Sequence, residues 1–331
     1  MKVAVIGAGS WGTALAQVVA KNNNETHLWA RKDEVVRGIN ENHANPRYLS
    51  DVALSKNITA TKSHEEALSG AQACVIVMPS STLRETAQAI APFVSDTLPI
   101  IICSKGVEAK TGMVGVEIFE DVLGNASRLA ALSGPNHAEE VILGTPSATV
   151  IASANEQTTQ LFQELFATFS FRTYASTDVL GVELCAAFKN VIAIATGCAY
   201  GLGYGDNTAA MLQTRGLAEM SRLVTACGGQ ALTCMGLAGT GDMIVTCMSR
   251  HSRNRRLGEM IAQGKTLNDF TAETHMVAEG AVACKTLGEL AAKVGVELPI
   301  TDIVRRVVWE DFDLRLVSDR LLDRPLKPEF Y

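Results

Sequence analysis

Two lysines and an aspartate occupy positions where a freely solvated charge is not expected. Lys189 lies in the middle of a long apolar segment, and Lys105 directly follows the apolar run IIICS. A buried ammonium is costly unless it is paired, and desolvation brings its pKa towards neutrality, where it can give and take a proton. Asp242 ends the glycine-rich loop GLAGTGD, and we expect it to pair with Lys189 and to set its pKa and orientation. The three residues predict acid–base chemistry; the alternatives are a lysine whose head reaches water and an aspartate that caps a helix.

A basic segment further along the chain has the composition of a phosphate site. Ser252, Arg253 and Asn254 are followed directly by two more arginines. Such side chains can hold a phosphate by charge-assisted and bidentate hydrogen bonds. A run of this kind is also typical of a solvated helix face, so the segment alone leaves both interpretations open.

A glycine-rich turn near the start of the chain predicts a dinucleotide site. Gly7, Gly9 and Gly12 form the pattern G-x-G-x-x-G between an expected strand and an expected helix. In such a turn the first glycine permits a tight bend and the second lets the backbone approach a pyrophosphate. The third lets the helix pack close to the sheet, with its N-terminal N–H groups aimed at the phosphates. The alternative is a tight turn that binds no ligand.

The end of the second expected strand bears on the choice of cofactor. It reads WARK at residues 29–32, without the acid that usually holds the ribose 2′-hydroxyl of NAD. Arg31 can instead meet the 2′-phosphate of NADP, whereas Asp33 lies slightly late but could still serve an NAD site. We therefore favour NADP and leave NAD open; Arg31 as a solvated surface residue is the alternative.

Composition and missing motifs exclude several other classes of protein. With 29 basic and 35 acidic residues among 331, the formal net charge is −6, which gives no basic footprint for nucleic acid or an anionic membrane. The six histidines show no metal-ligand spacing, and no G-x-S-x-G turn is present, so we expect no metal and no nucleophilic serine.

The cysteines and the most apolar segment bear on location. The eight cysteines form no C-x-x-C pair, and the chain starts without a secretory pattern, which together predict reduced core thiols and a cytoplasmic location. The apolar stretch 182–203 contains Glu183, Lys189 and Asn190, so we expect a buried helix and no membrane insertion.

Apolar runs in the first half of the chain alternate with helical patterns. We expect strands at residues 2–6, 26–30, 73–78, 98–104, 129–134 and 147–153, and helices at 13–21, 63–71 and 82–94. This alternation predicts an α/β fold with a Rossmann-type, doubly wound parallel sheet. From about residue 178 the segments are long and rich in Ala, Leu and Met, which predicts an all-α domain. We expect a dinucleotide-binding domain at 1–178, a helical substrate-binding domain at 179–331, and the site in the cleft between them.

Taken together, these segments resemble the bacterial-type NAD(P)-dependent glycerol-3-phosphate dehydrogenase family. The resemblance covers nearly the whole chain and is carried, in the family's order, by GAGSWGTALA (7–16), CSKG (103–106), SGPNHAEE (133–140), AAFKNVIAIATG (186–197), GDNTAAMLQTRGLAEM (205–220), GLAGTGDMIVTC (236–247), SRNRRLG (252–258) and VAEG (277–280). It implies reversible reduction of dihydroxyacetone phosphate to sn-glycerol 3-phosphate for glycerophospholipid synthesis, with NADPH or NADH as cofactor and a homodimer as the assembly.

The resemblance also implies roles for individual positions. Lys189 would be the general acid–base residue, with Asp242 supporting it and Lys105 touching both cofactor and substrate. The substrate site would be formed by Lys105, Gly134, Asn136, Lys189, Asn190, Asp242, Ser252, Arg253 and Asn254. The cofactor site would be formed by Gly7, Gly9, Ser10, Trp11, Gly12, Arg31, Lys105, Ala138, Arg253, Val277 and Glu279.

One segment departs from the family pattern. The family usually reads Ser-Gly-Pro-Ser/Thr-Phe-Ala where this chain has Asn136 and His137 after the proline. An asparagine can replace the hydroxyl as a hydrogen-bonding group, whereas the histidine puts a titratable ring where an aromatic ring normally packs. We keep Asn136 as a site residue and assign His137 no catalytic role.

Two other functions compete with this interpretation. Dehydrogenases of β-hydroxyacids or of ketopantoate also join a Rossmann domain to a helical one with a catalytic lysine, but the GLAGTGD and SRNRR segments imply a phosphate rather than a carboxylate. A nucleotide sensor that has lost catalysis is the second rival. The joint presence of Lys105, Lys189 and Asp242 argues against it.

Overall fold

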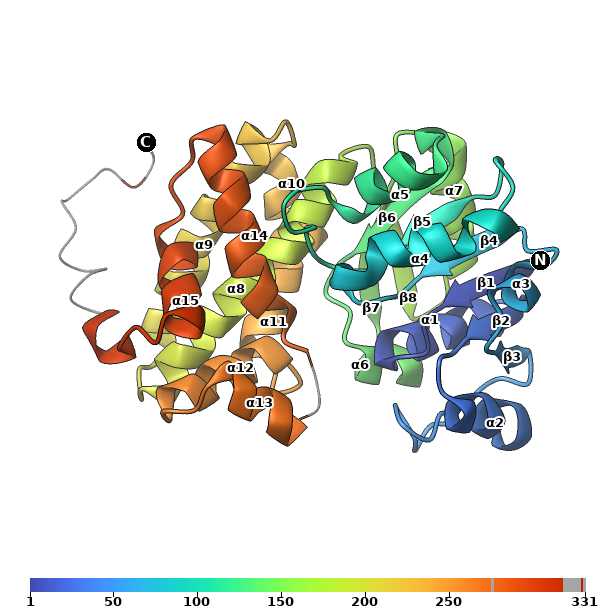
Figure 1. Cartoon of the computed structure of the whole chain (residues 1–331), viewed down its shortest axis with the longest axis horizontal. Helices are drawn as coiled ribbons and strands as arrows, with labels where there is room; N and C mark the ends of the chain where they lie inside the picture. The colour runs from blue at the N-terminus through green and yellow to red at the C-terminus, as the bar shows by residue number, and fades with distance from the viewer. Residues whose placement is uncertain (275–276, 318–328, 330–331) are drawn as a thin grey trace.

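Eight strands form one sheet in the first half of the chain (Figure 1). The computed structural model describes residues 1–274, 277–317 and 329. The strands are β1 (Lys2–Ile6), β2 (Glu25–Trp29), β3 (Ile58–Thr61), β4 (Ala73–Ile76), β5 (Ile100–Ile102), β6 (Leu129–Ser133), β7 (Ser147–Ala152) and β8 (Phe171–Ser176). Their order is β3-β2-β1-β4-β5-β6-β7-β8, and β4 and β5 are buried along their whole length, as strands covered on both faces must be.

Helices cover both faces of this sheet. They are α1 (Ser10–Lys21), α2 (Asp33–Asn42), α3 (His64–Leu68), α4 (Leu83–Ile90), α5 (Gly115–Leu123), α6 (Ala138–Leu143) and α7 (Glu156–Phe166). One face packs against α1, α6 and α7 through side chains such as Leu15 and Phe162. The other packs against α3, α4 and α5 through side chains such as Leu83 and Phe119. The predicted Rossmann-type fold is therefore confirmed.

The sheet is mostly parallel, and its one departure from the predicted pattern is the pair β6–β7, which is antiparallel. The six-residue helix α6 connects these two strands, and the chain re-enters the sheet in the opposite direction. Because β7 and β8 are parallel to each other, both run against the rest of the sheet.

Several elements of this half were not predicted. Two of them are the outermost strands, β3 at one edge and β8 at the other. β3 reads ITAT and β8 reads FRTYAS with mostly exposed or half-buried side chains, so neither shows a continuous apolar run. Edge strands need only one buried face, which removes the signal that identified the central strands.

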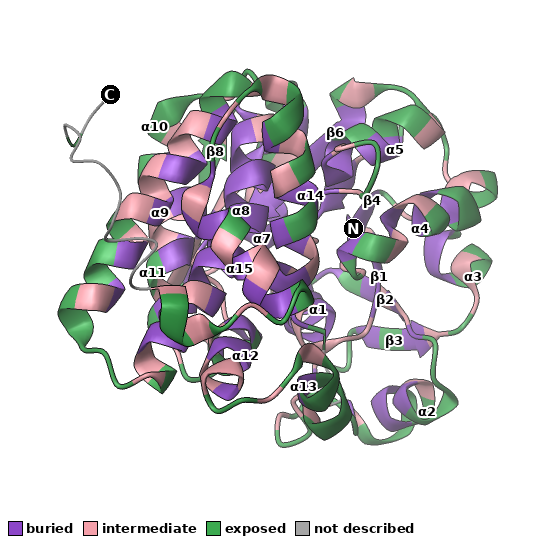
Figure 2. Ribbon diagram, turned by 60° about the vertical axis from the view of Figure 1, so that its left-hand side comes forward, coloured by how far each residue is buried: buried purple, intermediate pink, exposed green. Residues whose placement is uncertain are grey.

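The second half of the chain is helical (Figure 1). Its helices are α8 (Val179–Gly201), α9 (Asp206–Ala226), α10 (Ala231–Met235), α11 (Asp242–Met248), α12 (Arg253–Ala262), α13 (Leu267–Thr274), α14 (Glu279–Val294) and α15 (Pro299–Trp309), with a single π turn, η4 (Leu237–Gly241), before α11 and a 3₁₀ turn, η5 (Leu314–Leu316), after α15. α8 lies at the centre of this half, and the others pack around it (Figure 2). By length and composition α8 could cross a membrane, but 89% of its most apolar window is buried inside the protein, as predicted for a core helix.

The reversal of β7 and β8 determines where α8 begins. Ser176 at the end of β8 lies level with Ala152, which in turn pairs with Ala131 in the middle of β6, so the chain leaves the sheet heading away from the carboxyl ends of β1, β4, β5 and β6. Asp178 then caps α8 by accepting a hydrogen bond from Gly181 N at 2.9 Å. Eleven residues of helix rise about 16 Å, which is the height of β6, and they bring Lys189 to the carboxyl edge of the sheet.

Candidate active site

Lys105, Lys189 and Asp242 meet where the two halves of the chain face each other. Lys189 Nζ donates to Asp242 Oδ1 and to Thr246 Oγ1, the latter at 2.8 Å. Lys105 Nζ donates to Asp242 Oδ2 at 2.6 Å and to the carbonyl oxygen of Gly134 at 3.3 Å. The contact expected between Lys189 and Asp242 is therefore present, and one carboxylate bridges two ammonium groups.

Burial decides the electrostatics of this cluster. The side chains of Asp242 and Lys189 are 1% and 8% exposed. Burial lowers the pKa of Lys189 to about 7; the charge of Asp242 opposes this lowering, and the charge of Lys105 adds to it. Burial would raise the pKa of Asp242, but the two lysines outweigh it and hold that pKa below its usual value. The cluster thus contains a permanently charged acceptor and an amine that titrates near neutral pH.

Three different elements deliver these side chains. Lys105 follows the carboxyl end of β5, Lys189 projects from the middle of α8, and Asp242 opens α11 directly after the π turn η4. π turns are frequent at functional sites because they re-aim the residues that follow. Asp242 is the first residue of α11, yet its carboxylate is directed to the lysines rather than to the helix N-terminus, so its role as a simple cap is excluded.

Thr246 was not predicted as part of the site. Its hydroxyl accepts from Lys189 Nζ at 2.8 Å and donates to the carbonyl oxygen of Asp242. The signal in the sequence was its spacing, since residues four apart on a helix share one face.

A chain of amide contacts extends from this cluster towards α12. Asn190 Oδ1 accepts from Asn254 Nδ2 at 2.9 Å, and Asn254 Oδ1 accepts from Gly280 N at 2.9 Å. Ser252 is buried and caps α12 by accepting from Arg255 N at 3.2 Å. The predicted phosphate segment therefore forms the N-terminus of a ten-residue helix, where backbone N–H groups and the helix dipole favour an anion.

The arginines of that segment face different ways. Arg253 is exposed in the first turn of α12. Arg255 donates to Glu259 at 2.8 Å and lies 4.6 Å from the ring centroid of Tyr200, so its guanidinium is engaged within the helical half. The interpretation of the run as a solvated face therefore holds for part of it, and the interpretation as an anion site rests on Ser252, Arg253 and Asn254.

The segment with the unusual Asn136 and His137 borders the same cluster. Asn136 Nδ2 donates to the carbonyl oxygen of Ala148 at 2.8 Å, while Asn136 Oδ1 and His137 Nε2 are buried without a hydrogen-bond partner among the described residues. Burial and the charge of Lys189 lower the pKa of His137. Ala138 is buried at the start of α6.

The glycine-rich turn fits a dinucleotide. Gly7 has a φ of +117°, and a Cβ there would collide with the carbonyl oxygen of Val77, while a Cβ on Gly12 would collide with the carbonyl oxygen of Gly7. These two glycines are therefore required by the protein itself. At Gly9 a Cβ would meet no protein atom within 4 Å, so the open space there is what the close approach of a pyrophosphate requires.

Other residues of the predicted cofactor site lie in both halves of the chain. Ser10 and Trp11 open α1, and Arg31 follows β2 with its side chain exposed. Val277 is 53% exposed. Glu279 accepts from the hydroxyl of Ser80 at 2.6 Å, a contact that sequence reasoning missed although Ser80 follows the carboxyl end of β4.

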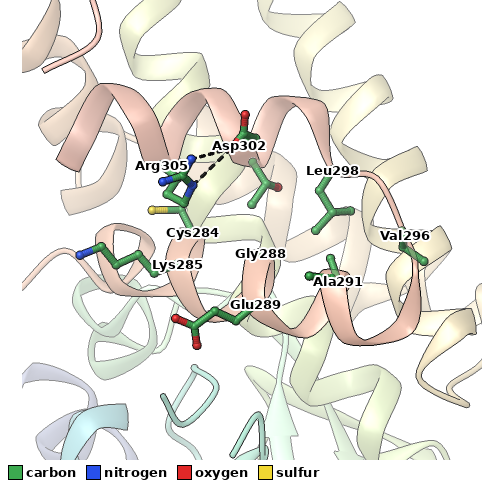
Figure 3. Close-up of a pocket in the computed structure, with 11 residues that line it drawn as sticks. Cys284, Lys285, Gly288, Glu289, Ala291, Val296, Leu298, Asp302 and Arg305 are labelled. Carbon is green, nitrogen blue, oxygen red and sulfur yellow. Dashed lines mark hydrogen bonds and ion pairs between the residues drawn. The ribbon is translucent and has the colours of Figure 1, made fainter. Parts of the chain in front are cut away.

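A groove of about 590 Å³ lies elsewhere, between α14 and α15 (Figure 3). Lys285, Glu289 and Arg305 lie along it, and Arg305 is paired with Asp302 at 2.9 Å. None of the predicted site residues lines this groove, and among the described residues no group of three His, Cys, Asp or Glu side chains is placed to hold a metal.

Two family models match the chain, one for each half. The model described as the N-terminus of NAD-dependent glycerol-3-phosphate dehydrogenase matches residues 2–159, and the model described as its C-terminus matches residues 178–318. The chain belongs to the NAD-dependent glycerol-3-phosphate dehydrogenase family. The resemblance inferred from the motifs is therefore confirmed.

Individual members of the family agree in sequence and in structure. A glycerol-3-phosphate dehydrogenase [NAD(P)+] from Chlorobium phaeobacteroides is 43% identical over 333 residues, covering 100% of both chains. The crystal structure of glycerol-3-phosphate dehydrogenase from Coxiella burnetii superposes with a TM-score of 0.93 at 36% identity, covering 97% of this chain and 98% of that one. A ketopantoate reductase from Ralstonia eutropha reaches a TM-score of 0.63 at 17% identity and shares the fold alone.

Within the family frame, the sheet half and the helical half each contribute to the cluster. Lys105 lies in the segment matched by the N-terminal model, and Lys189 and Asp242 lie in the segment matched by the C-terminal model. Lys105 from the N-terminal segment and Lys189 from the C-terminal segment thus both pair with the carboxylate of Asp242.

Proposed function

We propose that this chain catalyses the reversible reduction of dihydroxyacetone phosphate to sn-glycerol 3-phosphate with NADPH or NADH. The single observation that carries the proposal is the carboxylate of Asp242 bridging Lys105 and Lys189 at the carboxyl edge of a Rossmann-type sheet. That edge is where such sheets bind dinucleotides, and the glycine-rich turn opens onto it.

Lys189 acts as the general acid in the reduction. Its ammonium has three N–H groups, of which Asp242 and Thr246 accept two, so one remains for the C2 oxygen of the substrate. The reduced nicotinamide supplies a hydride to the C2 carbon. As negative charge develops on the C2 oxygen, Lys189 transfers its proton there, and Lys105 and Asn190 stabilise that charge electrostatically.

The substrate phosphate binds at the N-terminus of α12. Ser252, Arg253 and Asn254 supply hydroxyl, guanidinium and amide donors there, and the helix dipole adds to their attraction for an anion. Gly134 and Asn136 border the carbon chain on the side of β6. When the phosphate is held at the N-terminus of α12, the carbonyl group of the substrate is fixed beside Lys189. Part of the binding energy of the phosphate is then used to orient the reacting group.

The cofactor binds along the carboxyl ends of β1 and β2. Gly7, Gly9 and Gly12 would form the turn that holds the pyrophosphate, and the backbone N–H groups of Ser10 and Trp11 at the start of α1 would donate to it. Arg31 meets the adenosine ribose. Ala138, Arg253, Val277 and Glu279 would hold the nicotinamide end.

Further assignments accompany this function. The dinucleotide domain comprises residues 1–178 and the substrate domain residues 179–331; support comes from β8 ending at Ser176 and from Asp178 capping α8. We also propose that the protein acts as a homodimer in the cytoplasm, without membrane insertion or nucleic acid, and supplies a precursor of glycerophospholipids.

The test follows the absorbance of NADPH, and separately of NADH, while dihydroxyacetone phosphate is added to the purified protein. We expect rapid oxidation of the reduced cofactor that depends on the phosphate group, so dihydroxyacetone without phosphate is the control. Ketopantoate and a β-ketoacid are tested in parallel. Turnover of either in place of the phosphorylated substrate, or tight cofactor binding without turnover, would contradict the proposal.

A further inference from the structure

Lys62 is a cation at the dinucleotide edge of the sheet that the proposed site does not include. It follows β3 directly, and β3 runs parallel to β2 with Trp29 opposite Thr61. Ala30 N donates to the carbonyl oxygen of Thr61 at 2.9 Å, and Trp29 Nε1 donates to the carbonyl oxygen of Lys62 at 2.9 Å. This register holds the backbone of Lys62 beside the position from which Arg31 leaves the sheet.

The ammonium of Lys62 pairs with the acid that could otherwise serve an NAD site. Lys62 Nζ lies 2.9 Å from Asp33 Oδ1, and the two side chains are 51% and 75% exposed. The hydrogen bond from Lys62 is the main cause that lowers the pKa of Asp33. Asp33 is therefore ionised but faces a cation, and both groups remain open to a ligand.

Among the described residues, two further cations at this edge have no ion pair of their own. Glu34, beside Asp33 in α2, forms an ion pair with Arg47 at 2.6 Å. The carboxylate of Glu66 on α3 accepts a hydrogen bond from the hydroxyl of Thr61 and keeps its negative charge. Arg31 and Lys32 are exposed at the end of β2, and neither has an ion pair within the part of the chain that the structure describes.

We propose that Lys62 determines cofactor specificity, binding the adenosine 2′-phosphate of NADPH together with Arg31. This inference rests on the dinucleotide site of the proposed function and not on its substrate. Lys62 acts in two ways: its ammonium contacts the phosphate directly, and its pairing with Asp33 offsets the negative charge that would repel a phosphate at this position.

The experiment measures binding of adenosine 2′,5′-bisphosphate and of adenosine 5′-monophosphate to the full chain by titration calorimetry. These probes differ only in the 2′-phosphate and need no turnover, so the result is independent of whether dihydroxyacetone phosphate is a substrate. We expect Lys62→Ala to weaken binding of the bisphosphate about tenfold, the loss of one hydrogen bond to a charged group, and to leave the monophosphate within about twofold. Lys62→Arg should retain most of the preference.

The matched control is Lys56→Ala, because Lys56 is an exposed lysine in the loop before the same strand. We expect it to change neither affinity by more than about twofold, which separates local contact from the loss of one positive charge. Equal weakening of both probes by Lys62→Ala, no weakening of either, or an equal effect of Lys56→Ala would each overturn the proposal. Failure of the chain to bind either probe would overturn it together with the dinucleotide site.

Discussion

The surroundings of Lys189 have opposing effects on its pKa. Burial and Lys105 disfavour its charge, whereas Asp242 and Thr246 stabilise it through hydrogen bonds. A lysine at the surface would hold its proton too tightly to release it at neutral pH, and a lysine buried without an acid would not hold one. The bridging carboxylate lets one residue act as acid in one direction and as base in the other.

This balance predicts opposite pH profiles for the two directions of the reaction. Because burial lowers the pKa of Lys189 to about 7, kcat/KM for reduction should fall as pH rises above 7, since the proton donor is lost. The same quantity for oxidation should rise across the same interval, since the base is formed. Initial rates at constant ionic strength from about pH 7 to about pH 9 measure both.

The control for this prediction is Lys189→Met, which fills a similar volume without a titratable group. We expect its kcat to fall by about 10²–10⁴ and its residual rate to lack the opposed pH dependence, while cofactor binding by fluorescence is retained. The substrate phosphate titrates near pH 6, so the comparison is made above about pH 7. Profiles that run in the same direction for both reactions would rule out Lys189 as the shared acid and base.

At the scale of elements, the turn between β1 and α1 separates structural from functional glycines. Gly7 and Gly12 are enforced by contacts with the protein's own backbone, whereas Gly9 is enforced by nothing in the free protein. Gly9 has φ −75° and ψ −175°, an extended conformation open to any residue. A glycine at this position therefore lowers the free energy of unfolding, because it gives the unfolded chain more conformational freedom, and no contact in the free protein requires it.

Gly9→Ala should therefore stabilise the free protein and weaken cofactor binding. We expect the free energy of unfolding to rise by about 0.4–1 kcal/mol, because alanine restricts the unfolded chain and meets no atom in the fold. NADPH affinity should fall, because the methyl group occupies the space the pyrophosphate needs. Urea unfolding and cofactor titration measure the two effects; Gly12→Ala is the contrast and should lose stability. A stabilised variant with unchanged cofactor affinity would show that no ligand approaches Gly9.

What could be predicted from the sequence follows from how local each signal is. The central strands, the glycine-rich turn and the burial of Lys189 in an apolar helix could each be predicted from a few neighbouring residues. The roles of Ser80 and Thr246 depended on which elements meet, and the engagement of Arg255 with Tyr200 and Glu259 depended on how α12 packs. The reversal of β7 could not be predicted, because an apolar run indicates a strand but not the direction in which that strand runs.

For the whole molecule, buried polar groups join the two halves. Lys105 reaches Asp242, Ser80 reaches Glu279, and the carboxylate of Glu183 on α8 accepts from Val116 N at the start of α5 at 3.1 Å. Burial raises the pKa of Glu183 to about 8 and that of Glu219, which accepts from Ile300 N, to about 7. The folded protein therefore binds protons that the unfolded chain, with ordinary glutamate pKa values, has already released.

The contribution of these two glutamates to stability should consequently fall as pH rises from about 4.5 to about 8, whereas the lowered pKa of Lys189 adds stability as pH rises above about 7. A raised folded-state pKa gives a contribution that is complete below the unfolded pKa and is lost through the folded pKa, at about 1.4 kcal/mol for each pH unit that separates the two pKa values. Glu183→Gln should flatten this fall by a few kcal/mol, and the exposed Glu289→Gln is the matched control. Urea unfolding at several pH values tests it; equal slopes in wild type and Glu183→Gln would mean that Glu183 does not titrate in this range.

Because α8 begins at the end of the sheet opposite the carboxyl ends of β1, β4, β5 and β6, its length determines where Lys189 lies. Eleven residues of rise from Asp178 match the height of five strand residues in β6, so the length of a strand and the phase of a helix are tied together. One residue inserted between Asp178 and Lys189 would turn the lysine by about 100° and aim it into the packed interior. Insertions in this interval are therefore tolerated only in whole turns matched by a taller sheet, whereas the α9–α10, α12–α13 and α14–α15 loops contain no proposed site residue and carry no such constraint. Length variation within this architecture should concentrate in those loops and spare the first three turns of α8.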